Sequence, residues 1–146
     1  TSDLWPLATA IELPQAPSAA FTRSGRSGAV RIRTPVASNR ALARAKGNDI
    51  SGAFSDYQIA IKLKPSDPLP YFNLGILYGM EKDYNNCLTN FTKATELNPE
   101  NPAAYYYRAI VTIDSGHPEL CCGDLKKALA LGYQPANVEL VKYCKQ

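Results

Sequence analysis

The sequence lacks the motifs that most enzymes carry. It has a single histidine, no glycine-rich phosphate loop and no Gly-x-Ser-x-Gly motif. A general acid or base works beside a nucleophile or substrate, and the turn Gly116-His117-Pro118 offers His117 no such neighbour in sequence. No stretch approaches 18 uninterrupted apolar residues, so we expect no membrane-spanning helix. These absences predict a protein without a catalytic site.

Metal-ligand spacings are also missing. Metal sites in proteins use clustered ligands at short, regular spacings. The four cysteines include no Cys-x-x-Cys pair, and Cys121 and Cys122 are directly adjacent. We therefore expect no metal and no cofactor.

Acidic residues are absent from residues 15–46, and this absence divides the chain. Residues 1–46 carry seven basic and two acidic side chains (net charge +5), whereas residues 47–146 carry nine and eleven (net charge −2). Four of the eleven prolines fall within the first 36 residues, and Ser24-Gly25-Arg26-Ser27-Gly28 has the composition of a flexible linker. We predict an extended Pro/Arg/Ser-rich arm over residues 1–36 and a folded domain over residues 37–146.

The folded part repeats with a period of 34 residues. Small residues recur at one position as Ala53, Cys87 and Cys121, and at another as Ala60, Ala94 and Ala128. In the middle period, Tyr71, Leu74, Gly75 and Tyr78 follow the i, i+3, i+4, i+7 spacing of one helical face. Cys87, Phe91 and Ala94 continue this spacing on a second helix. Each period therefore predicts a pair of helices.

The helix boundaries follow from turn and capping signals. Asn101 is a suitable N-cap, and Pro102 suits the first helical position. We predict helices over residues 37–47, 50–64, 69–81, 84–97, 102–115, 118–131 and 135–145.

This pattern resembles the tetratricopeptide repeat (TPR) family. Residues 68–101 match the family pattern at Tyr71, Leu74, Gly75, Tyr78, Cys87, Phe91, Ala94 and Pro99. Residues 102–133 match at Tyr105, Ala109, Gly116, Cys121, Leu125 and Ala128 but lack the closing proline, and residues 34–67 match mainly in their second helix. The resemblance implies an all-α, right-handed α–α superhelix of three repeats (34–67, 68–101 and 102–133) with a cap helix over residues 135–145.

The resemblance also bears on the last cysteines. Bacterial proteins of this family often end with a cysteine on the last second helix, then Asp-Leu-Lys-Lys-Ala, a Leu-Gly turn and Lys-Tyr-Cys, as this sequence does from Cys122 to Cys144. This implies either a Cys122–Cys144 disulfide, in an oxidising compartment, or two reduced cysteines in the cap interface. The ending favours an exported or periplasmic protein, and the composition of the arm is compatible with an organelle.

The first helix of each repeat lines the concave groove in this family. Carried across, the groove positions are Asn39, Leu42, Lys46, Phe72, Asn73, Ile76, Met80, Tyr106, Tyr107, Ile110 and Ile113. Among the three consecutive tyrosines, Tyr105 is expected inside, with Tyr106 and Tyr107 open to the groove; the alternative is that these rings pack between repeats. Some family members clamp a C-terminal carboxylate with Lys, Asn and Arg. Here only Asn73 fits, while Leu42, Ala103 and Tyr107 replace the other residues, so we predict no such clamp.

These features predict a non-enzymatic scaffold that binds other protein subunits, as an assembly factor or an accessory subunit of a larger complex. Partners would contact the groove and the arm, where the candidate contacts are Trp5, Arg23, Arg26, Arg31 and Arg33. One alternative is attachment of the basic arm to nucleic acid or an anionic membrane surface. Another is autoinhibition, in which apolar arm residues fill the groove.

Overall fold

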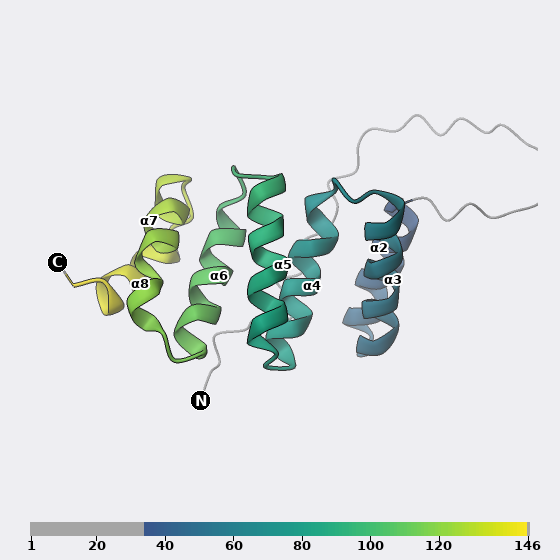
Figure 1. Cartoon of the computed structure of the whole chain (residues 1–146), viewed down its shortest axis with the longest axis horizontal. Coiled ribbons are helices and arrows are strands. Elements are labelled where there is room, and N and C mark those ends of the chain that lie inside the picture. Colours follow the sequence, from purple (N-terminus) through teal and green to yellow (C-terminus); the bar gives the residue numbers. More distant parts are fainter. Residues whose placement is uncertain (1–33, 146) are drawn as a thin grey trace, which may run out of the picture.

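A computed structural model describes residues 34–145 as a stack of helices without a strand in that range (Figure 1). Its elements are α2 (Thr34–Lys46), α3 (Ile50–Leu63), α4 (Pro68–Met80), α5 (Tyr84–Leu97), α6 (Pro102–Asp114), the 3₁₀ turn η1 (Pro118–Leu120), α7 (Cys122–Ala130) and α8 (Ala136–Tyr143). The prediction of an all-helical repeat fold is confirmed.

Helix N-termini are fixed by the same side-chain chemistry in successive repeats. Asp49, Asp67, Asp83 and Asn101 each accept a hydrogen bond from a backbone N–H in the first turn of the following helix. Such caps satisfy N–H groups that have no partner within the helix. The predicted N-cap at Asn101 is confirmed.

Four helix starts differ from the prediction, those of α4 and α8 by a single residue. Helix α2 begins at Thr34, so residues 34–36 form its first turn although the sequence pattern assigned them to the arm. Pro35 suits an early helical position because its fixed φ matches a helix. Helix α7 begins at Cys122, because the chain after His117 first forms the short turn η1.

The turn inside each helix pair has a left-handed residue that recurs every 34 residues. Asn48, Lys82 and Gly116 have φ values of 65°, 59° and 90°. In each turn the next residue donates its N–H to a carbonyl one turn back, as Asp83 N does to Tyr78 O at 2.9 Å. This is the hydrogen bond that ends many helices at a left-handed residue. The backbone thus repeats the period even where the side chains differ.

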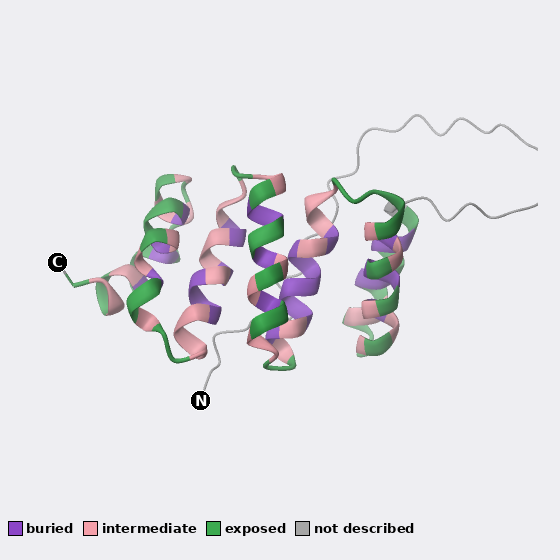
Figure 2. Ribbon diagram, viewed as in Figure 1, coloured by how far each residue is buried: buried purple, intermediate pink, exposed green. Residues whose placement is uncertain are grey.

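The helices pack as consecutive antiparallel pairs. Helices α2 and α3, α4 and α5, and α6 and α7 form the pairs; α3 contacts α4, α5 contacts α6, and α8 packs on α7. Helix α4 lies centrally, and eight of its thirteen residues are buried, which is visible in Figure 2. The buried side chains form three clusters along the stack, and partly buried residues such as Tyr78 and Tyr106 pack against two of them.

Gly75 allows the helices of the middle pair to approach closely. A Cβ atom at this position would lie 2.9–3.0 Å from three carbons of the Phe91 ring. Such a separation is shorter than van der Waals contact, so the glycine makes room for the aromatic ring.

Within residues 34–145, every helix is too short or too polar to cross a membrane.

Candidate partner-binding surface

The predicted groove residues lie on the first helices of the three pairs, α2, α4 and α6, which we call the helix-A row. Their burial varies widely. Six of the eleven are buried: Leu42, Phe72, Asn73, Ile76, Tyr107 and Ile110. Met80, Tyr106 and Ile113 are half-buried, and Asn39 and Lys46 are exposed. The accessible part of the row is therefore smaller than the sequence pattern indicates.

Aromatic packing between repeats explains part of this burial. The Tyr107 ring stacks on Phe91 with centroids 6.1 Å apart and meets Phe72 edge-on at 6.0 Å. Tyr107 is consequently only 4% exposed, so the expectation that it opens onto the groove is wrong. Tyr105, expected inside, is only half-buried and lies beneath the Arg108 guanidinium, 5.6 Å from its ring centroid. The register of α6 turns Tyr107 toward the preceding pair.

Tyr106 is the accessible aromatic residue of this group. Its ring lies between those of Tyr107 and Tyr133, with centroid distances of 5.3 and 4.9 Å. Burial, together with the nearby Glu139 carboxylate and Tyr133, raises the pKa of Tyr106 to about 12. The side chain is neutral near pH 7, and its neighbours hold a partly exposed ring in a fixed position. Such a ring is suited to anchoring a partner chain.

The arginines of α2 are engaged within their own repeat. Arg40 donates from Nε and Nη2 to both oxygens of Asp56, and Arg44 Nη1 donates to the same carboxylate at 2.9 Å. Asp56 is 1% exposed. The hydrogen bond from Arg40 is the main cause of its lowered pKa, because it outweighs the opposing effect of burial. Neither guanidinium group is free to neutralise an acidic ligand unless this network opens.

Arg108 links three helices. It donates to both oxygens of Asp124 on α7, at 2.7 and 2.6 Å, and its Nη1 donates to the Thr95 hydroxyl on α5 at 3.1 Å. The ion pair joins the two helices of the third repeat, and the hydrogen bond to Thr95 ties that repeat to the second.

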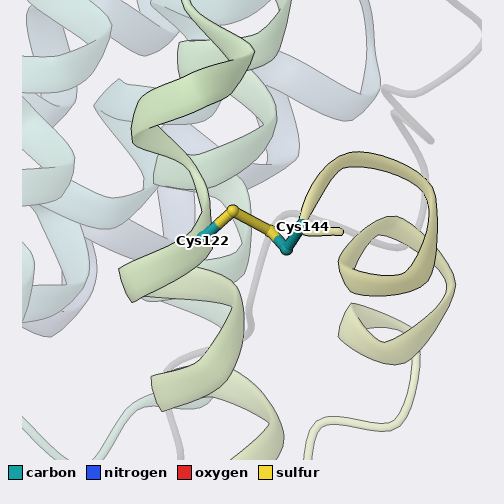
Figure 3. The surroundings of a disulfide bond; sticks show 2 residues. All are labelled: Cys122 and Cys144. Atoms are coloured by element: carbon teal, nitrogen blue, oxygen red, sulfur yellow. A yellow bond between two sulfur atoms is a disulfide. The ribbon is translucent and has the colours of Figure 1, made fainter. Parts of the chain in front are cut away.

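The C-terminal cap is held covalently. Cys122 at the start of α7 and Cys144 at the end of α8 form a disulfide (Figure 3). The free thiol of Cys121 lies beside them, with all three sulfur atoms within 4.8 Å of one another. The resemblance pointed to Cys122 and Cys144, whereas the repeat pattern placed Cys121 only at a recurring small position.

His117, the single histidine of the sequence, lies in an exposed turn. His117 Nδ1 is 3.4 Å from Glu119 Oε1, and both side chains are 63% exposed. This arrangement is a solvated surface pair, and it brings no nucleophile to the imidazole.

Comparisons with known proteins agree with the helical pairs. A model of the TPR repeat matches residues 41–82. Tetratricopeptide repeat protein 6 of Homo sapiens is 40% identical over 58 residues, which are 40% of this chain and 11% of that protein. Two solved structures have the same fold. The first TPR of Spaghetti (RPAP3) bound to the HSP90 peptide SRMEEVD has a TM-score of 0.72 and 20% identity, covering 77% of this chain and 90% of that one. The Arabidopsis OM64 TPR domain has a TM-score of 0.70 and 23% identity, covering 75% and 93%.

The chain contains a tetratricopeptide repeat at residues 41–82, within a fold that it shares with solved TPR domains. TPR domains generally mediate protein–protein interaction, and the fold is typically non-enzymatic. The chain spans about one tenth of the length of its human TPR relative, so the whole-protein role of that relative is not carried over.

Several predicted contacts of this chain lie outside the residues that the structure describes. They are the arm residues Trp5, Arg23, Arg26, Arg31 and Arg33.

The structure also shows two features that the sequence pattern did not predict. These are the Arg–Asp pairs within the first and third repeats and the position of Cys121 beside the disulfide. The sequence contains a signal for these ion pairs, because Arg40 and Arg108 are two repeat periods apart and so are Asp56 and Asp124.

Proposed function

We propose that this protein is a non-catalytic scaffold that serves as an assembly factor or accessory subunit of a larger complex. It would bind a segment of a partner protein along the helix-A row and make further contacts through the arm. The observation that carries this proposal is the Tyr106 ring, which is half-exposed and packs against the rings of Tyr107 and Tyr133. Met80 and Ile113 add partly exposed apolar side chains to the same row.

The chemistry of the row favours an apolar partner segment over an acidic tail. The positions that a carboxylate clamp would fill with Asn, Lys and Arg are occupied by Leu42, Ala103 and Tyr107, and all three are buried. The nearby Arg40 and Arg44 are bonded to Asp56. We therefore expect a different ligand from the acidic peptide SRMEEVD that occupies the Spaghetti structure.

The test compares two sets of substitutions in the full chain. Changing Met80, Tyr106 and Ile113 to serine alters the helix-A row, whereas changing Leu88 and Leu129 to serine alters half-buried residues on second helices. Affinity capture followed by mass spectrometry is expected to lose its partners only with the first set. Recovery of the same proteins with both sets would contradict the proposal, as would tight binding of SRMEEVD in fluorescence anisotropy.

A second candidate function rests on the net charge of +5 over residues 1–46. Attachment to nucleic acid or an anionic membrane would use Arg23, Arg26, Arg31 and Arg33, since Arg40 and Arg44 are occupied by Asp56. Binding of this kind weakens steeply with salt. Retention on a single-stranded DNA column or on phosphatidylserine vesicles that is lost by about 0.2 M NaCl, and lost when these four arginines become glutamine, would favour this function.

A further inference from the structure

Three cysteine sulfurs meet where the last repeat joins its cap. The Sγ atoms of Cys121, Cys122 and Cys144 all lie within 4.8 Å of one another. Cys121 is fully buried at the N-cap of α7, while the disulfide-bonded Cys122 and Cys144 are half-buried and therefore within reach of solvent. The fourth cysteine, Cys87, occupies the same repeat position as Cys121 but donates its thiol to the Gly75 carbonyl at 3.0 Å.

We propose that, when the Cys122–Cys144 disulfide is reduced, the thiolates of Cys121, Cys122 and Cys144 bind one zinc ion. Zinc takes thiolate ligands at about 2.3 Å in a tetrahedral arrangement, which places the sulfurs about 3.8 Å from one another. No two of the three sulfurs are more than 4.8 Å apart, so side-chain rotation can bring them to this spacing once the disulfide is broken. A water molecule completes the four ligands because the site opens to solvent beside the half-buried cysteines.

The electrostatic surroundings favour a bound cation. Three carboxylates, those of Glu139, Asp124 and Glu119, interact electrostatically with Cys121. The same three carboxylates stabilise a positive ion at the sulfurs. The N-terminus of α7, which begins at Cys122, stabilises the thiolates once they have lost their protons.

The chemistry proceeds in two balanced steps. A phosphine supplies two electrons and becomes its oxide, while water supplies the oxygen and two protons; the Cys122–Cys144 bond breaks and three thiols remain. Zinc binding then releases three protons to solvent and forms three metal–sulfur bonds. In either state α8 stays attached to α7, first by the disulfide and then by the metal. The cap therefore keeps its position under both oxidising and reducing conditions.

The test uses the full chain reduced with a phosphine, freed of reductant and held without oxygen. Cobalt(II) serves as the spectroscopic probe, and zinc(II) competes for the site. We expect one Co²⁺ per chain with sulfur-to-cobalt charge-transfer absorption, displacement by Zn²⁺, and a higher melting temperature of the reduced protein with Zn²⁺.

Two cysteine variants make the assignment specific. Cys121→Ser keeps the disulfide pair, so its oxidised fold can be verified first, and it is expected to weaken cobalt binding by more than about tenfold. Cys87→Ser removes the equivalent buried thiol of the second repeat and should bind cobalt like the wild type. The inference is overturned if the reduced wild type binds no cobalt, if Cys121→Ser binds as tightly, or if Cys87→Ser abolishes binding.

Discussion

Arg40 donates to both carboxylate oxygens of Asp56, from Nε at 2.7 Å and from Nη2 at 2.6 Å. The same two bonds, at the same distances, join Arg108 to Asp124. Both members of the second pair lie 68 residues further along, which is two periods of the repeat. The middle repeat has Leu74 and Asn90 at these positions, so it lacks the ion pair that the repeats on either side have.

Removing Asp56 tests how much the ion pairs of Asp56 with Arg40 and Arg44 contribute to stability. Asp56→Ala is expected to lower the free energy of unfolding by about 2 kcal/mol, because Arg40 and Arg44 lose a buried partner. The loss is smaller than for a fully buried pair, since these arginine side chains are 42% and 38% exposed. Urea denaturation measures it. Glu96→Ala, which removes an exposed ion pair with Lys93, is the control and should change little; equal losses would argue against the network.

The same carboxylate predicts a pH dependence of stability. The hydrogen bond from Arg40 lowers the pKa of Asp56 in the folded protein, whereas the unfolded value is about 3.9. Asp56 therefore contributes its full stabilisation above about pH 4 and loses it as the pH falls through the lowered folded value. The urea midpoint of Asp56→Asn should decline less between about pH 5 and about pH 2 than that of the wild type. Parallel declines would show that Asp56 does not contribute.

Replacing Arg108 and Asp124 with the leucine and asparagine of the middle repeat tests whether either residue pair can stabilise the third repeat. Arg108→Leu alone leaves Asp124 without its partner and should cost about 2 kcal/mol. Adding Asp124→Asn recreates the Leu74 and Asn90 combination and should recover most of that loss. Thermal unfolding of the single and double variants checks this, and a double variant less stable than the single one would contradict it.

The contact between Gly75 and Phe91 predicts another compensating pair. Gly75→Ala places a methyl group against the ring and is expected to destabilise the protein by about 2 kcal/mol. Phe91→Leu should restore part of this loss, because the third repeat combines Ala109 with Leu125 in one buried cluster. If the losses of unfolding free energy caused by the two substitutions simply add in guanidinium denaturation, the side chains at positions 75 and 91 do not compete for the same space.

Lys82 predicts a stabilising substitution. Its φ of 59° is unfavourable for a side chain other than glycine or asparagine. Lys82→Gly should raise the unfolding free energy by about 1 kcal/mol, and Gly116→Ala, at the same position of the next repeat, should lower it by a similar amount. Differential scanning calorimetry of the two variants measures both effects. A fall in the melting temperature of Lys82→Gly would show that its backbone is not strained.

The 34-residue period predicted the helices well because small, aromatic and capping residues recur at fixed offsets. It did not predict the burial of Tyr107, since spacing identifies a face of α6 but not how far the preceding repeat covers it. It also did not reveal the role of Arg40, which interrupts the apolar pattern of the first helix. Its partner, Asp56, belongs to another helix, and only the packed pair brings the two charges together.

The repeats differ in how their interiors are packed, and this difference determines where the protein begins to unfold. The central repeat is held by buried aromatic and aliphatic side chains, whereas polar networks replace part of that packing in the repeats on either side. Repeat arrays open in segments, each with its own free energy. Fraying should therefore begin at the two flanks and reach α4 last, so amide protons near Ile76 and Leu77 should be the slowest to exchange with deuterium.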